Sequence, residues 1–276
     1  MRSPPATVEA LQAVGPPAIE VTGLSKRFET AVGTVAAIES VTFAVRPGEF
    51  LCLVGPSGCG KSTVLNIIAG LLPASGGQLR ICGNPGGGIL PDRIGYVFQR
   101  DALLPWKTAL QNVMLPLLLR GVPVTQSRQD ALHWVRKVGL GGFENHYPSQ
   151  LSGGMRKRIS LAMTMVYRPS IILMDEPFAA LDVQTRNLME NELLALWAEA
   201  GSTVLFVTHD LEEAIALADR IIVLTAAPAR IRADYPVPLD RPRDVAEIRT
   251  SSGFVDIYRR IWRDLREEVA ASHGRR

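Results

Sequence analysis

The chain has 276 residues, of which 47% are apolar, enough to bury a core in one large domain or in a domain with an inserted subdomain. Its 30 basic and 27 acidic residues leave a formal net charge of +3. No dense basic run occurs, and no run approaches the roughly 18 apolar residues of a membrane-spanning helix, which argues against nucleic-acid partners and against membrane insertion. The three cysteines form no C-x-x-C pair, so we interpret them as cytosolic thiols.

The chain is expected to divide into an arm, a large domain and a tail. Residues 1–18 contain two proline pairs and no signal-peptide core, which predicts a flexible N-terminal arm. Residues 19–235 are expected to form an α/β domain, with antiparallel strands over 19–45 followed by the strand–helix alternation of a parallel sheet. A block at about 100–157 interrupts this alternation and predicts an inserted α-helical subdomain. Residues 236–276 are predicted to be a C-terminal extension with an amphipathic helix.

A phosphate-binding loop follows the apolar run at residues 50–54. The segment G-P-S-G-C-G-K-S matches G-x-x-x-x-G-K-[ST], and a helical pattern begins at its end. Glycines let backbone N–H groups approach phosphate, and the helix N-terminus favours negative charge. Lys61 is expected to reach the β- and γ-phosphates, and Ser62 to ligate Mg²⁺. The predicted phosphate-loop residues are Gly55, Pro56, Ser57, Gly58, Cys59, Gly60, Lys61, Ser62 and Thr63.

Polar residues follow three other predicted strands, at the sheet edge where α/β proteins bind ligands. Asp175 and Glu176 come after the apolar run at 171–174. Asp175 is suited to Mg²⁺, and Glu176 to polarising the attacking water. Gln99 could offer its amide oxygen to Mg²⁺ or to this water, and His209 could orient the water or the γ-phosphate.

The other elements are predicted from apolar periodicity and from proline and glycine breakers. Further strands are expected at 78–82, 94–98, 204–207 and 221–224, and helices at 152–167, 183–200, 211–218 and, with breaks near Pro116 and Pro123, at 108–141.

Two apolar features have alternative interpretations. Leu103, Leu104 and Trp106 lie on a loop, where they either pack inside the chain or meet a partner protein. The tail carries an apolar stripe at helical spacing from Phe254 to Val269, which either covers the chain's own core or forms a contact with another subunit.

The segment L-S-G-G-M at 151–155 resembles the LSGGQ signature of ATP-binding cassette (ABC) proteins. The other sequence motifs of that family occur in the same order along the chain. Gln99 resembles the Q-loop glutamine, and His209 resembles the switch histidine. Asp182 lies in a segment, A-L-D, that resembles the D-loop. Phe28 stands where the family places an aromatic ring that stacks on adenine. The resemblance implies a P-loop NTPase (RecA-like) core with an antiparallel β subdomain and an inserted α-helical subdomain.

The same resemblance implies that two cassettes form a homodimer with two ATP molecules between them. Ser152, Gly153, Gly154 and Asp182 would then contact the ATP that is held by the partner's phosphate loop. The implied cofactors are ATP and Mg²⁺.

Several stretches are similar to the cassettes of nitrate, sulfonate, taurine and bicarbonate importers. They are M-R-K-R at 155–158, D-E-P-F-A-A-L-D at 175–182, D-A-L-L-P-W-K-T at 101–108 and R-T-S-S at 249–252. This likeness implies an ATP-hydrolysing importer subunit, peripheral on the cytoplasmic face of the membrane. It would power a separate permease, supplied by an extracytoplasmic solute-binding protein, and would have no nucleic-acid partner.

Two positions depart from the family pattern. Met155 replaces the signature glutamine, and Met163 stands where relatives commonly have arginine. We expect ATPase activity to survive both changes.

Two other functions share some of these motifs. One is a soluble ABC ATPase that acts on DNA or ribosomes, and the other is a phosphoryl-transfer kinase with the same phosphate loop. A single cassette without sustained heptads disfavours the first, and the L-S-G-G-M segment disfavours the second. The sequence does not identify the transported solute, because the cassette itself would not contact it.

Overall fold

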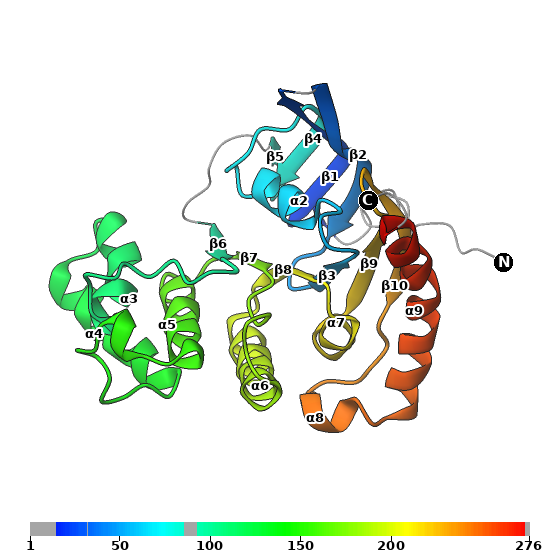
Figure 1. Ribbon diagram of the computed structural model, residues 1–276. Helices are drawn as coiled ribbons and strands as arrows, with labels where there is room; N and C mark the ends of the chain where they lie inside the picture. The colour runs from blue at the N-terminus through cyan, green and yellow to red at the C-terminus, as the bar shows by residue number, and fades with distance from the viewer. Residues whose placement is uncertain (1–14, 32, 86–92, 274–276) are drawn as a thin grey trace. The chain divides into compact units, whose positions relative to one another are not determined.

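The computed structural model describes residues 15–31, 33–85 and 93–273, so most of the predicted N-terminal arm lies outside the described residues. The chain forms two compact units (Figure 1). The first unit consists of Met1–Leu90 and Thr203–Arg276, and the second of Pro91–Ser202.

The first unit carries most of the strands. Its strands are β1 (Ile19–Thr30), β2 (Gly33–Val45), β3 (Phe50–Val54), β4 (Gly76–Ile81), β5 (Asn84–Pro85), β8 (Thr203–Thr208), β9 (Arg220–Leu224) and β10 (Ala229–Pro236). Its helices are α2 (Lys61–Ile68), α7 (Leu211–Leu217), α8 (Val245–Ile248) and α9 (Ser252–His273).

These strands are ordered β5-β4-β1-β2-β10-β9-β3-β8. Strand β1 is antiparallel to β2 and β4, whereas β3 is parallel to both β8 and β9. All five residues of β3 are buried, as expected for a strand with parallel partners on both sides. The predicted change from antiparallel strands to a parallel sheet is confirmed. Strand β10 was not predicted, because charged residues at every second position from Arg230 to Asp234 obscure the apolar pattern.

Helices α2 and α7 lie on opposite sides of the parallel strands (Figure 1). The tail helix α9 contacts α7, β9 and β10 of its own unit. Its stripe is buried through Phe254, Ile257, Ile261 and Leu265. The tail's apolar stripe therefore covers the chain's own core.

The second unit contains two strands and a group of helices. They are β6 (Ile94–Val97), β7 (Ile171–Asp175), α3 (Ala109–Leu119), α4 (Val124–Lys137), the short 3₁₀ helix η2 (Pro148–Gln150), α5 (Gly153–Met165) and α6 (Val183–Ala200). Strands β6 and β7 pair in parallel, with Ile94 opposite Ile171 and Val97 opposite Met174. Helix α3 packs against α4 and α5.

The predicted helix break near Pro116 is wrong. Pro116 lies inside α3, which continues to Leu119. Only three residues follow the proline before the helix ends, so few backbone hydrogen bonds depend on the turn that it enters, and Leu117 of this turn is buried. The break at Pro123 is confirmed, because Pro123 precedes the first residue of α4.

The loop before α3 divides its apolar residues between the interior and the surface. Leu103 is buried with 9% of its surface exposed, whereas Trp106 is 69% exposed. Internal packing therefore accounts for Leu103 but not for Trp106. Among the helices that the structure describes, none is long and apolar enough to cross a membrane.

Candidate functional site

The phosphate loop connects the buried strand β3 to α2, and its backbone requires glycine. Gly60 is the N-cap of α2 with φ 110°, and a Cβ atom there would lie 2.9 Å from the carbonyl oxygen of Ala37. Gly58 has φ 76°, which side chains disfavour. A Cβ atom at Gly55 would lie 2.9 Å from the Sγ atom of Cys59. The first turn of α2 contains no acidic residue, so the loop and the helix N-terminus form an anion-binding site.

Lys61 and Ser62 begin α2 with opposite exposure. The Nζ atom of Lys61 donates hydrogen bonds to the carbonyl oxygens of Gly55 at 2.8 Å and Pro56 at 3.1 Å, and the side chain is buried. Its positive charge is thereby held across the loop. Ser62 is exposed in the first helical turn, where its hydroxyl group can reach a ligand in solution. Thr63 is the third residue of this turn and is half-buried.

His209 leaves the sheet beside the phosphate loop. Val54, the last residue of β3, lies opposite Thr208, the last residue of the parallel strand β8. Gly55 and His209 therefore start from the same edge of the first unit, as predicted. His209 is exposed, and Asp210 caps α7 by accepting hydrogen bonds from the amides of Glu212 and Glu213.

Phe28 lies on β1 of the same unit. Its ring is 37% exposed, and the Nζ atom of Lys26 lies 5.0 Å from the ring centroid. An exposed aromatic ring of this kind can stack on a planar base.

In the second unit, the pairing of β6 with β7 brings Gln99 and Glu176 together. The two parallel strands end in register, so the residues that follow them leave from the same edge. The Nε2 atom of Gln99 lies 3.5 Å from Oε2 of Glu176. Glu176 has φ 42°, a left-handed conformation that non-glycine residues rarely adopt and that is concentrated at functional sites.

Asp175 is half-buried at the end of β7. Burial, together with the charge of Asp175, raises the pKa of Tyr96 on the neighbouring strand β6 well above its ordinary value. Tyr96 therefore stays neutral beside this carboxylate. The strand end offers two acidic side chains and one amide group, a set suited to binding a cation and orienting water.

The signature-like segment forms the start of α5. The Oγ atom of Ser152 accepts a hydrogen bond from the amide of Met155 at 3.3 Å, which caps the helix. A Cβ atom at Gly154 would lie 2.9 Å from Cγ2 of Thr185, so packing explains this glycine. A Cβ atom at Gly153 would meet only the Nη2 atom of Arg156 at 3.9 Å. Packing within the chain therefore does not explain Gly153, whereas close approach of a ligand would.

Asp182 caps α6. Its Oδ1 atom accepts a hydrogen bond from the amide of Thr185 at 3.0 Å, and this bond lowers the pKa of Asp182. The structure therefore gives Asp182 a capping role that the sequence analysis did not include.

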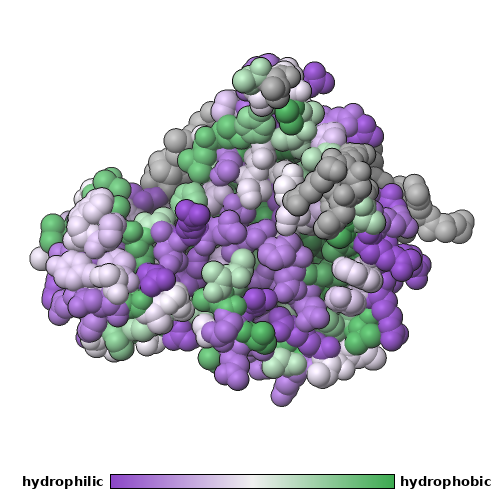
Figure 2. Space-filling view, viewed as in Figure 1, coloured by the Kyte–Doolittle hydropathy of each residue, from purple (hydrophilic) through white to green (hydrophobic). Residues whose placement is uncertain are grey.

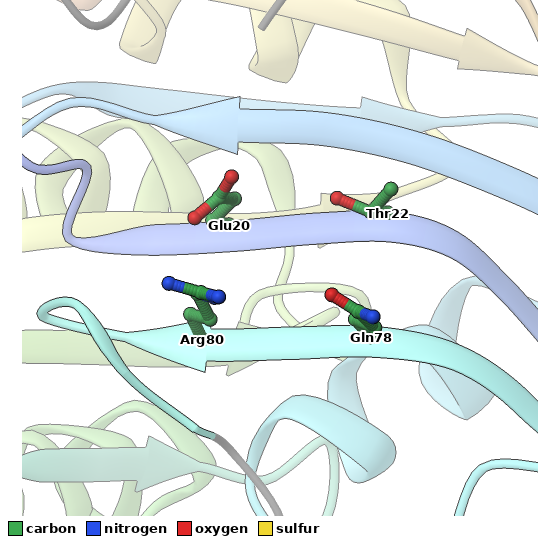
Figure 3. Close-up of a pocket in the computed structure, with 4 residues that line it drawn as sticks. All are labelled: Glu20, Thr22, Gln78 and Arg80. Atoms are coloured by element: carbon green, nitrogen blue, oxygen red, sulfur yellow. The ribbon is translucent and has the colours of Figure 1, made fainter.

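A shallow polar hollow of about 220 Å³ lies elsewhere, on the antiparallel strands of the first unit (Figure 3). Glu20 and Thr22 of β1 line it, facing Arg80 and Gln78 of β4, their partners in the strand register. These are ordinary cross-strand pairs of a polar surface, and none of them belongs to the predicted site.

Lys157, for which no role was predicted, contacts the backbone after strand β6 and pairs with Asp101. The Nζ atom of Lys157 donates hydrogen bonds to the carbonyl oxygens of Phe98 and Gln99, and lies 3.3 Å from Oδ1 of Asp101. Only the fold reveals this contact, because Lys157 is far from Gln99 in the sequence.

Comparison with known proteins gives a consistent result. A family model described as ABC transporter matches residues 38–179. An uncharacterized ABC transporter ATP-binding protein from Methanocaldococcus jannaschii is 46% identical over 254 residues, covering 92% of this chain and 93% of that protein.

Several relatives have importer names. The aliphatic sulfonates import ATP-binding protein SsuB 1 from Burkholderia lata is 44% identical over 257 residues, covering 93% of this chain and 74% of that protein. The nitrate import ATP-binding protein NrtD from Synechococcus elongatus is 41% identical over 224 residues, covering 80% of this chain and 81% of that protein.

A solved ATP-binding cassette, described as a dimer in a post-hydrolysis state bound to ADP and Pi, superposes with a TM-score of 0.73. It is 32% identical, and the match covers 80% of this chain and 100% of that one. The predicted P-loop NTPase fold is thereby confirmed. Given the family match, the identities over most of the chain and this structural likeness, the chain belongs to the ABC transporter family and is its ATP-hydrolysing cassette.

Proposed function

We propose that this ATPase subunit powers an importer that takes up a small solute such as nitrate, a sulfonate, taurine or bicarbonate. The observation that carries the proposal is the high identity, over most of the chain, to nitrate and aliphatic sulfonate import ATP-binding proteins. A taurine import ATP-binding protein is similar at 39% identity. All three named solutes are small and carry an anionic group, so we expect the transported molecule to belong to this class.

ATP binding is assigned mainly to the first unit. The phosphates lie on the loop at residues 55–63, where backbone amides and Lys61 supply positive charge, and Phe28 stacks on the adenine ring. Ser62 and Asp175, with the amide oxygen of Gln99, are the ligands that Mg²⁺ would have in addition to phosphate oxygens. Their chemistry fits, because Mg²⁺ prefers oxygen ligands and binds through one or two carboxylates together with phosphate. When bound, this ion neutralises part of the phosphate charge.

Among the described residues, no group of three or more His, Cys, Asp or Glu side chains could hold a metal ion alone.

Hydrolysis is assigned to residues at the ends of strands. Glu176 takes a proton from the attacking water, since its carboxylate is half-buried and lies next to an amide group at 3.5 Å. Gln99 orients this water through its side-chain amide. His209, exposed beside the phosphate loop, donates a hydrogen bond to the γ-phosphate or to the water.

A second copy of the chain completes each site. Ser152, Gly153, Gly154 and Asp182 act on the ATP that is bound by the partner's phosphate loop. Two observations support this assignment: packing within the chain leaves Gly153 unexplained, and the structural relative is a dimer. Backbone amides at the start of α5 would face the γ-phosphate.

The second unit is proposed to dock on permease subunits at the cytoplasmic face of the membrane, with an extracytoplasmic solute-binding protein delivering the solute. Trp106 is 69% exposed, and Leu119 and Val124 are also exposed in this unit. Figure 2 shows hydrophobic side chains interrupting the polar surface where α3 and α4 lie. Exposed apolar side chains of this size favour a protein partner.

The proposal is tested by deleting the gene in its own host and measuring uptake of labelled nitrate, taurine, bicarbonate and a short alkanesulfonate. We expect uptake of one of these to fall, to return with the wild-type gene and to stay low with Glu176→Gln. Unchanged uptake of all four would contradict the proposed importer class. Hydrolysis of ATP by the purified protein is measured separately.

A further inference from the structure

A buried lysine joins the start of α5 to the end of β6 within the second unit. Lys157 is 5% exposed, and its ammonium group has three oxygen partners. They are the carbonyl oxygens of Phe98 at 3.1 Å and Gln99 at 3.2 Å, and Oδ1 of Asp101 at 3.3 Å. An ammonium group has three hydrogens to donate, so these partners satisfy it fully.

Asp101 extends the connection to the signature-like segment. Its other carboxylate oxygen, Oδ2, accepts a hydrogen bond from Nε of Arg156 at 3.0 Å. Arg156 in turn donates from Nη1 to the carbonyl oxygen of Leu151 at 2.7 Å. A continuous chain of charged contacts therefore runs from the backbone of Gln99 through Lys157, Asp101 and Arg156 to the residue before Ser152.

This series of contacts joins two segments that have roles in the proposed function, namely the end of β6 at Gln99 and the signature-like segment. Gln99 is exposed, and its side chain lies 3.5 Å from the Glu176 carboxylate. Two hydrogen bonds from Lys157 to the carbonyl groups of residues 98 and 99 limit how far this strand end can move. Burial lowers the pKa of Lys157, and the negative charge of Asp101 opposes this effect.

We propose that Lys157, acting with Asp101, is a positioning residue that holds Gln99 against Glu176 and links this strand end to the signature segment. The inference rests on the proposed function, in which Gln99 orients the attacking water. Lys157 itself touches neither nucleotide nor water in this account. It acts through the backbone of Gln99.

Positioning and stability can be separated at this residue. Replacing a buried ion pair with apolar groups is often neutral for stability, although breaking one side of it costs free energy. A purely structural lysine would change the thermal midpoint and leave the turnover of the folded protein unchanged. A positioning lysine changes turnover, and does so only while Gln99 is present.

The test is a double-mutant cycle on the purified full-length chain with Lys157→Met and Gln99→Ala. We expect each single change to lower kcat for ATP by about tenfold, with KM within about twofold, because the phosphate loop is untouched. The double variant should be no slower than Gln99→Ala alone. Lys137→Met is the matched control, since Lys137 of the same unit pairs with the exposed Glu199 at 2.6 Å and should leave kcat unchanged.

Wild-type kcat in Lys157→Met, or losses that multiply in the double variant, would overturn the inference. If Lys157→Met does not fold, Asp101→Asn takes its place in the same cycle, because Asp101 is partly exposed and its amide keeps the shape of the side chain.

Backbone hydrogen exchange supplies a readout that does not depend on activity. Lys157→Met should speed exchange at residues 98–101 and 151–155 together, while Lys137→Met should not. Exchange unchanged at both segments would overturn the inference. Absence of ATP hydrolysis in the wild-type protein would refute the proposed function. The exchange result would still show whether Lys157 connects the strand end at Gln99 to the signature-like segment.

Discussion

The two units place different chemistry at the ends of their parallel strands. In the first unit, β3 and β8 end at backbone amides, Lys61 and His209, groups that attract a phosphate anion. In the second, β6 and β7 end at Gln99, Asp175 and Glu176, groups whose chemistry is suited to binding a cation or to orienting and deprotonating water. In the proposed function, the same local architecture supplies phosphate binding in the first unit and hydrolysis in the second, so mutations in the two units should separate ATP affinity from turnover.

The sharpest separation is expected at Glu176. Glu176→Gln should lower turnover by about 100-fold or more, the scale of losing a general base, because the amide cannot accept the proton of water. ATP affinity should stay near the wild-type value. Steady-state hydrolysis measures turnover, and binding of a fluorescent ATP analogue measures affinity. Near wild-type turnover in this variant would contradict the assignment of hydrolysis to the second unit.

Lys61→Ala should give the opposite pattern. Loss of a charged hydrogen-bond donor to the phosphates should weaken ATP binding by about 10- to 100-fold, corresponding to roughly 1.5–3 kcal/mol. Calorimetric titration with ATP measures this change. Unaltered affinity would mean that the phosphate loop is not the binding half of the site.

Substitutions in the tail helix α9 should show that its buried side, and not its exposed side, stabilises the fold. Ile261 is fully buried between α9 and its own unit, so Ile261→Ala should lower the free energy of unfolding by about 2–5 kcal/mol. ATP turnover of the folded variant should be unchanged. Trp262→Ala on the exposed side of α9 is the control, and equal thermal midpoints for the two variants would contradict cis packing of the helix.

At Trp106, on the loop before α3 in the second unit, a substitution should affect coupling to the permease and not stability. Trp106→Ala should leave the thermal midpoint within about a degree, because little surface is buried there. Basal hydrolysis should be unchanged, and stimulation of hydrolysis by the reconstituted permease should be lost. Leu103→Ala, at the buried position of the same loop, should instead lower the thermal midpoint. Normal stimulation in Trp106→Ala would argue against this docking surface.

Much of the site could be predicted from sequence because its residues follow strands that are recognisable by their apolar runs. Gly55, Gln99, Asp175 and His209 each come within two residues of a strand end, and parallel pairing aligns strand ends.

The contacts of Lys157 could not be predicted, since a basic residue next to two arginines is typical of a solvated helix face. The continuation of α3 past Pro116 was also missed, because packing against α4 and α5 overrides the local preference. Strand β10 was missed because every second residue from Arg230 to Asp234 is charged, and its two arginines pair with acids on other elements. Arg230 pairs with Glu39, and Arg232 with Glu267.

The central claim is that phosphate binding by one chain is completed by the signature segment of its partner. Lys61→Ala and Ser152→Ala chains are each expected to hydrolyse almost no ATP alone. Mixed in equal amounts, half of the dimers pair the two chains and each has one intact site, so activity should return to about a quarter of the wild-type rate. A mixture no more active than its components, or a fully active Ser152→Ala protein, would contradict the account.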